Sequence, residues 1–170
     1  MKNIQFRKAK IAEINQIWKI LQQAIVRRKK DGSNQWQDEY PNLETLQNDI
    51  KKNSGFVLTN NDIVIGYSAI FINNEPEYKN IEGNWLTNND FIVIHRVAIS
   101  ENYLGKGFAK IIFNFAEKYA LKHGIYSIKA DTNHDNVAMI KIFNKLGYTY
   151  CGKVHFRGSP RNAFEKVLIN

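Results

Sequence analysis

The sequence predicts a mixed α/β fold, in which one sheet combines parallel and antiparallel strands and helices cover both of its faces. Two observations support this. Apolar segments with strand or helix periodicity follow one another in the order β-α-α-β-β-β-α-β-α-β-β along the 170 residues. The strand–helix–strand unit of residues 91–131 also requires a parallel pair with a right-handed crossover, whereas hairpins join the other strands. The length fits one domain, residues 1–170.

The N-terminal part of the chain is expected to supply one strand and two helices. Residues 3–8 have the pattern of a first strand. Isoleucines and a leucine at helical spacing then predict an amphipathic helix from residue 11 to about Lys30. A shorter polar helix is expected around residues 43–52, where Asn53-Ser54-Gly55 ends it.

A hairpin and a long polar segment follow. Asn60-Asn61 separates the apolar runs of residues 55–59 and 62–72, which predicts an antiparallel pair joined by a tight turn. Residues 73–90 form a mainly polar connection that contains an isolated tryptophan, Trp85. A connection this long is often functional or has local structure of its own.

The C-terminal part contains the parallel unit and a closing hairpin. Strands are expected at residues 91–99 and 125–130, with a helix between them that ends at Gly124. Asn133-His134-Asp135 is expected to cap a further helix that Gly147 stops. The apolar runs that follow, residues 148–156 and 163–169, are expected to close the chain as an antiparallel pair.

The composition predicts a cytoplasmic globular protein. Hydrophobic residues make up 44% and charged residues 24% of the chain, which contains one cysteine and therefore no internal disulfide. The N-terminus lacks the pattern of a secretory signal, and no apolar run approaches the length of a membrane span. The net charge of +8 suggests nucleic acid, but the one dense basic run, Arg27–Lys30, falls where a helix is expected to end. We therefore expect neither a nucleic-acid nor a membrane partner.

The segment Asn-Tyr-Leu-Gly-Lys-Gly-Phe-Ala, residues 102–109, is a glycine-containing turn that leads into a helix. Gly105 and Gly107 allow backbone conformations closed to other residues and a close approach to a ligand. A helix N-terminus also stabilises an anion through its backbone N–H groups. Taken alone, the turn favours a strand-to-helix connection that needs glycine only for its geometry.

Flanking sequences give this turn a family context. Val97-Ala98-Ile99 ends the apolar strand before it, and residues 136–148 (NVAMIKIFNKLGY) form the helix about 30 residues later. In this order the two motifs resemble those of the GNAT superfamily of acyl-CoA-dependent N-acyltransferases. The resemblance implies a mostly antiparallel sheet of about seven strands, with a central parallel pair that splays apart.

The resemblance also implies how acetyl-CoA binds, with no metal. The donor would lie in the gap between the strands at about 91–99 and 125–132, with its pantetheine arm on the backbone of the first strand. The pyrophosphate would sit on the glycine turn, and the helix of residues 136–148 would contribute a pantetheine contact and a side chain near the thioester sulfur. The residues implied are Val97, Ala98, Ile99, Leu104, Gly105, Lys106, Gly107, Phe108, Ala109, Asn136 and Phe143.

Two of the departures from the family pattern matter most. Leu104 stands where arginine or glutamine is usual, so a charge-assisted contact is absent unless Lys106 or Lys110 supplies it. Phe143 stands where many members have a tyrosine that protonates the leaving thiolate. Because a thiol has a pKa of about 8.5, the thiolate can leave without being protonated.

Two residues are candidates for the general base that an amine acceptor requires. Asp131 ends the strand of residues 125–130 at a position that matches a catalytic carboxylate in some family members, and it also fits a turn carboxylate bonded to its own backbone. His95 has a suitable ordinary pKa of about 6.5 but also fits a core histidine. His134 is assigned to the helix cap.

In the superfamily, the first helices and the last hairpin build the acceptor site. The corresponding residues here lie in segments 34–41 and 157–161, with further charged candidates elsewhere. Each of these side chains also fits an ordinary packing or surface role. The candidates are Trp36, Tyr40, Glu82, Arg96 and Arg157.

The sequence thus predicts an enzyme that transfers an acetyl group from acetyl-CoA to an amine of a small molecule or protein. A homodimer is also possible by analogy with similar proteins. Two alternatives stay open: a non-catalytic module that binds acyl-CoA or nucleic acid, and an acyltransferase with another donor. Succinyl-CoA is such a donor, and Arg96, Arg157 and Arg161 would suit its carboxylate.

Overall fold

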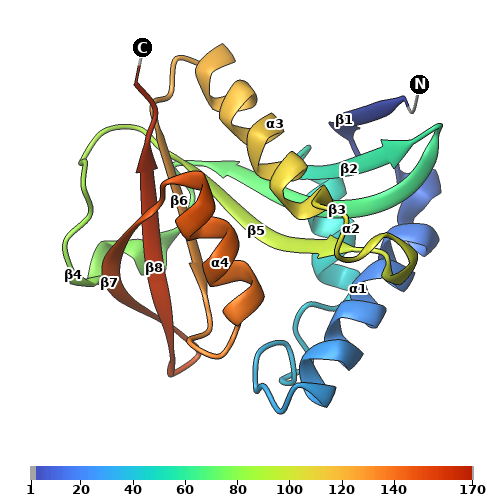
Figure 1. The fold of residues 1–170 in the computed structure, drawn as a ribbon, viewed down its shortest axis with the longest axis horizontal. Helices are drawn as coiled ribbons and strands as arrows, with labels where there is room; N and C mark the ends of the chain where they lie inside the picture. The colour runs from blue at the N-terminus through green and yellow to red at the C-terminus, as the bar shows by residue number, and fades with distance from the viewer. Residues whose placement is uncertain (1–2, 170) are drawn as a thin grey trace. The chain divides into compact units, whose positions relative to one another are not determined.

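The computed structural model describes residues 3–169 (Figure 1). The chain divides into two compact units. The first unit contains residues up to Ile70 together with Arg96–Phe113, and the second contains Phe71–His95 together with the chain from Asn114. The strands follow the order β1-β2-β3-β5-β6-β8-β7-β4. Neighbouring pairs are antiparallel where the register is defined, except the parallel pair β5–β6. The predicted mixed α/β class with one parallel pair is confirmed.

The first unit begins with a strand, two helices and a hairpin, as predicted. Antiparallel ladders join β1 to β2 and β2 to β3. The run Arg27–Lys30 forms the last turn of α1, where its cations complement the helix dipole. The elements are β1 (Ile4–Lys8), a 3₁₀ turn (Ile11–Glu13), α1 (Ile14–Lys30), α2 (Leu43–Lys51), β2 (Gly55–Asn60) and β3 (Ile63–Ile72).

Helices cover both faces of the strands in the first unit. Val57 and Tyr67 are partners in the β2–β3 ladder and belong to one hydrophobic cluster with Leu21 of α1. On the opposite face, Gly66 lies so close to Ile99 and Ile112 that an added Cβ would come within 2.8 Å of the Ile99 side chain. The alternation of side chains along a strand therefore directs neighbouring residues to α1 and to the start of α3.

The second unit contains the parallel pair and the closing hairpin. The parallel ladder joins Ile92 and Val93 to Ile128 and Lys129, and β8 pairs antiparallel with both β6 and β7. The elements, two of which begin or end in the first unit, are a 3₁₀ turn (Pro76–Asn80), β4 (Glu82–Gly83), β5 (Ile92–Ile99), α3 (Phe108–Lys122), β6 (Ser127–Thr132), α4 (Val137–Leu146), β7 (Thr149–Phe156) and β8 (Ser159–Val167).

The two faces of this unit are covered differently. On one face, Phe143 of α4 packs against Phe164 of β8 with ring centroids 4.7 Å apart. On the other, Tyr78 belongs to a hydrophobic cluster with Val93 and Ala163. The segment of residues 73–91, rather than a helix, therefore provides this second cover. It contains the 3₁₀ turn and β4, in line with the local structure expected for a connection of its length.

Three details differ from the sequence predictions. Within residues 3–169 the sheet has eight strands rather than about seven, because Glu82–Gly83 adds the short β4. Asp131 lies within β6 rather than just after the strand. The cap predicted at residues 133–135 was wrong: Asn136 is the N-cap of α4 and accepts a hydrogen bond from the Met139 N–H.

Candidate functional site

Both predicted bases lie in one polar cluster of the second unit. The Asp131 carboxylate Oδ1 is 3.7 Å from Nδ1 of His95, and Nε2 of His95 is 2.5 Å from Oε2 of Glu75. Asp131 Oδ1 also accepts a 2.7 Å hydrogen bond from the Tyr78 hydroxyl. These side chains are mostly buried, with 15% of the His95 side chain and 10% of the Asp131 side chain exposed.

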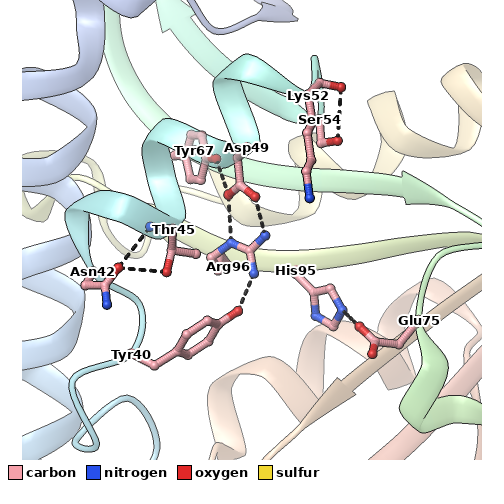
Figure 2. A network of polar contacts seen from close by, with 10 residues as sticks. All are labelled: Tyr40, Asn42, Thr45, Asp49, Lys52, Ser54, Tyr67, Glu75, His95 and Arg96. Carbon is pink, nitrogen blue, oxygen red and sulfur yellow. Dashed lines mark hydrogen bonds and ion pairs between the residues drawn. The ribbon is translucent and has the colours of Figure 1, made fainter.

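The contact with Glu75 bears on which ring nitrogen of His95 can accept a proton. With Glu75 ionised, its carboxylate only accepts hydrogen bonds, so the tautomer that fits this contact carries its hydrogen on Nε2. In the neutral ring this leaves Nδ1 as the nitrogen able to accept a proton. Asp131 lies beside that nitrogen and stabilises the imidazolium that would form. Figure 2 shows Glu75 next to the His95 ring.

Tyr78 connects the cluster to the hydrophobic core of the second unit. Burial raises the pKa of Tyr78 well above its ordinary value, and the negative charges of Asp131 and Glu75 and the hydrogen bond to Asp131 raise it further. The phenol therefore stays protonated at neutral and alkaline pH and remains a donor to Asp131. Its ring packs against Trp85, with centroids 4.9 Å apart.

Removing this hydroxyl is expected to destabilise the protein. Tyr78→Phe leaves a mostly buried carboxylate oxygen without its donor, so the free energy of unfolding should fall by about 1.5–3 kcal/mol. Urea denaturation measures the change. Tyr126→Phe, at a position that is 41% exposed, serves as the control and should change stability by less than about 0.5 kcal/mol. Equal effects of the two substitutions would show that the Tyr78–Asp131 hydrogen bond contributes nothing.

A pocket of about 650 Å³ adjoins this cluster. Glu75 and Tyr78 line both the pocket and the cluster, while Trp85, Phe91 and Lys129 line the pocket alone. Its volume is within the range of about 300–1,000 Å³ that is usual for small-molecule sites. Sequence reasoning missed Glu75 and Tyr78 because a lone carboxylate and a tyrosine in a polar segment look like surface residues. The unusual length of residues 73–90 was the signal that pointed to them.

A second polar network lies in the first unit and involves two of the predicted acceptor residues. The Arg96 guanidinium donates to both oxygens of Asp49, at 2.9 and 2.7 Å, and also donates to the Tyr40 hydroxyl. The Tyr67 hydroxyl donates to Asp49 at 2.7 Å. Figure 2 shows Asp49 of α2 between Tyr67 and Arg96, with Tyr40 on the other side of the guanidinium.

This network gives Arg96 a structural role that the sequence did not indicate. Burial lowers the pKa of Arg96, but the nearby Tyr40 and Asp49 oxygens outweigh it and leave the pKa raised, so the side chain is charged. Its charge is matched by Asp49 within the unit. Arg96 also has φ of 56°, in the left-handed region where arginine is strained, which the ion pair helps to hold.

The other acceptor candidates occupy separate positions. Trp36 packs against the hydrophobic cluster that contains the buried residues of α1, which agrees with the alternative of a packing role. Glu82 is on β4 with a side chain that is 68% exposed, 3.7 Å from His155. Arg157 is in the exposed turn between β7 and β8. A role in acceptor binding stays a prediction for all of these residues.

The predicted donor residues fall in both units. In the first unit, Gly105 and Gly107 have φ of 71° and 81°, and a Cβ at either would meet nothing within 4 Å. Phe108 then begins the 15-residue helix α3. Lys106 donates a 2.7 Å hydrogen bond to the Asn102 carbonyl, and Leu104 is 39% exposed. Val97, Ala98 and Ile99 form the end of β5.

In the second unit, the two predicted donor residues have defined partners. Asn136 donates to Thr132 Oγ1 at 2.9 Å in addition to capping α4. Phe143 is 1% exposed and lies between the rings of Tyr148 and Phe164. Among residues 3–169, no group of three or more His, Cys, Asp or Glu side chains is arranged to hold a metal ion, and no helix is long and apolar enough to cross a membrane.

Comparison with known proteins gives a consistent result. A structure of a GNAT-family acetyltransferase from Streptococcus agalactiae is 36% identical and superposes with a TM-score of 0.89, covering 98% of this chain and 96% of that one. A Salmonella typhimurium protein solved with its cofactor acetyl-CoA has 16% identity and a TM-score of 0.71, covering 99% of this chain and 95% of that one, and so shares the fold. Streptothricin acetyltransferase from Escherichia coli is 33% identical over 64 residues, 38% of this chain and 37% of that protein.

The family assignment follows from the extent of these matches. The profile of the acetyltransferase (GNAT) family matches residues 15–148, which include β5, the glycine turn, α3, β6 and α4. The match with the Streptococcus agalactiae protein covers nearly all of both chains. The resemblance drawn from the two sequence motifs is confirmed, and the chain belongs to the acetyltransferase (GNAT) family.

Proposed function

We propose that this acetyltransferase moves the acetyl group of acetyl-CoA to a primary amine of a small molecule or protein, by direct attack in a ternary complex. The observation that carries the proposal is the cluster of Glu75, His95 and Asp131. It places a proton-accepting nitrogen next to a carboxylate, and Glu75 of the cluster also lines a pocket whose volume is usual for small-molecule sites. The acetyl-CoA reported with the Salmonella typhimurium protein supports the choice of donor.

The chemistry requires a group that removes a proton from the acceptor. The amine nitrogen attacks the thioester carbonyl carbon, a C–N bond forms, and the C–S bond breaks with release of the CoA thiolate. The amine gives up its proton to Nδ1 of His95, and Asp131 stabilises the charge produced on the ring. Glu75 holds the ring in position through Nε2–H. No donor to the thiolate is needed, so phenylalanine at position 143 is compatible with the reaction.

The glycine turn is proposed to hold the CoA pyrophosphate. Its positive φ values and the open space around Gly105 and Gly107 leave the backbone accessible to a ligand. The first N–H groups of α3 have no partner within the helix, so they are suited to phosphate oxygens. Since Leu104 cannot contribute a charge, binding would rest mainly on these backbone groups. Val97, Ala98, Ile99, Asn136 and Phe143 keep the roles that the family resemblance implies.

Two neighbouring substitutions test whether the backbone or a lysine provides the affinity. Gly107→Ala meets no clash but disfavours the left-handed conformation by about 1–2 kcal/mol, so the free turn relaxes away from it. Restoring this conformation on binding should raise the Kd for acetyl-CoA by about 5- to 30-fold. Lys106→Ala should raise it by no more than about fivefold, because the lysine is at an exposed helix end. Isothermal titration measures both. A larger loss for Lys106→Ala would show that this lysine replaces the usual arginine or glutamine.

The decisive test of the proposed function is release of free CoA thiol with a panel of amines. We expect at least one primary amine in the panel to cause release of CoA thiol. The panel should include streptothricin because the Escherichia coli relative is a streptothricin acetyltransferase. Succinyl-CoA is assayed beside acetyl-CoA to identify the donor. Binding of acetyl-CoA without any thiol release would instead support a non-catalytic binding module.

A further inference from the structure

The pocket beside the candidate bases contains a buried cation. Lys129 of β6 is 3% exposed as a residue and lines the pocket together with Trp85 and Phe91. Its ammonium nitrogen lies 4.5 Å from the centroid of the Trp85 ring and 4.2 Å from that of Phe91. A lysine placed among aromatic rings on the wall of a pocket is unusual, because a buried ammonium normally has a paired carboxylate.

The polar contacts of this ammonium are weak. Its hydrogen bond to the Thr87 carbonyl is long, at 3.5 Å, and it forms no ion pair within 4 Å among residues 3–169. Burial lowers the pKa of Lys129, although the negative charge of Glu165 partly offsets this. An ammonium can donate three hydrogen bonds, so it retains capacity for an acceptor in the pocket.

Glu165 does not take up that capacity, because other donors occupy it. Its Oε1 accepts from the hydroxyls of Thr87 and Ser127, both at 2.6 Å, and its Oε2 accepts from the Leu86 N–H at 2.6 Å. The Thr87 N–H adds a longer bond of 3.3 Å. The carboxylate is thus satisfied by residues 86–87 and 127, and it fixes the segment that forms the pocket wall.

We propose that Lys129 binds a carboxylate of the acceptor, so that the acceptor is a small amine that also carries a carboxylate, as an amino acid does. Glu75 lines the same pocket and hydrogen-bonds His95. An ammonium group bound by Glu75 would therefore lie next to the proposed base, His95. The pocket therefore has a cation and an anion of its own for a ligand that carries both charges. Trp85 and Phe91 exclude water from the lysine and strengthen its interaction with an anion.

This inference rests on the proposed function for the transfer step but not for binding. The probes are the standard α-amino acids and their matching carboxamides, which differ only in the charge opposite Lys129. Binding is measured by isothermal titration without acetyl-CoA, and transfer by thiol release. For the amino acid that binds most tightly, we expect the carboxylate form to be favoured over the carboxamide by about 10- to 150-fold in Kd and in kcat/KM.

The variants isolate the charge of the lysine. Lys129→Met should reduce the preference for the carboxylate to about twofold or less, Lys129→Arg should retain most of it, and Lys122→Met on the exposed end of α3 should leave it unchanged. A wild-type protein that binds both forms equally, or binds neither, would overturn the proposal, and this result does not require any variant to fold. A preference that persists in Lys129→Met would also overturn it.

The two proposals fail in different ways. If the carboxylate form binds in a Lys129-dependent way but no thiol is released, the role of Lys129 in carboxylate binding would be supported. The same result would contradict acetyl transfer to amines that carry a carboxylate. Thiol release with amines that lack a carboxylate, at the same kcat/KM as with those that carry one, would uphold the acetyltransferase function and reject the role of Lys129.

Discussion

His95→Gln is expected to lower kcat/KM for the acceptor amine by about 10²–10⁴-fold, which is the usual contribution of a positioned general base. Glutamine retains a hydrogen-bonding side chain but cannot accept and hold a proton at neutral pH. The Kd for acetyl-CoA should stay the same, because the proposed role concerns the acceptor. Thiol release measures kcat/KM, and isothermal titration measures the Kd.

Companion variants separate proton transfer from a general disturbance of the site. Asp131→Asn should also reduce kcat/KM, since it removes the charge that stabilises the imidazolium 3.7 Å away. Glu75→Gln should also reduce kcat/KM, because it removes a carboxylate that lies 2.5 Å from Nε2 and stabilises the imidazolium, even though an amide oxygen still accepts from Nε2–H. His123→Gln, at an exposed position in the turn that follows α3, is the matched control and should retain full activity. Wild-type turnover by both His95→Gln and Asp131→Asn would exclude this cluster as the base.

Asp49→Ala is expected to have the largest effect on stability. The substitution leaves the Arg96 guanidinium charged and buried without its carboxylate, and removal of one partner of a buried ion pair costs about 3–5 kcal/mol. It also removes the acceptor of the Tyr67 hydroxyl. For a protein of this size the Tm should fall by about 6–20 °C, which scanning calorimetry detects.

An ion pair with one exposed partner in the same unit provides the control. Asp31 is 3.5 Å from Arg28 with a side chain that is 55% exposed, so Asp31→Ala should cost less than about 1 kcal/mol. A double-mutant cycle gives the decisive comparison: Arg96→Met should cost less in the Asp49→Ala background than in the wild type. Additive losses would mean that the two side chains do not stabilise each other.

Local sequence patterns were sufficient for the elements and for the family. The spacing of apolar residues identified α1 and α4 because each must bury one stripe of its surface. The strand–helix–strand unit required the parallel pair β5–β6. A helical crossover returns the chain to the end of the sheet where the first strand began, so the second strand runs in the same direction. Two motifs near Gly107 and Asn136 were enough for the family because they correspond to short, local structures.

Local patterns failed to identify the N-cap residue of α4 and the short strand β4. Asn133, His134 and Asp135 have the side chains of helix caps, yet Asn136 makes the capping hydrogen bond. Several polar residues in succession can each cap a helix, and the backbone entry into α4 selects among them. The two residues of β4 have no pattern of their own and form a strand only because β7 lies beside them.

The sequence by itself determined the order of the elements, the mixed sheet and the two candidate bases, because helix and strand periods, turn residues and the chemistry of His and Asp are local properties. Only the tertiary structure decided that Glu75 holds His95, that Asp49 neutralises Arg96, and that Lys129 lies on a pocket wall next to the Trp85 ring. These contacts join residues 20 to 47 positions apart in the chain. The charge state and function of a polar side chain depend on such distant partners, which no local pattern records.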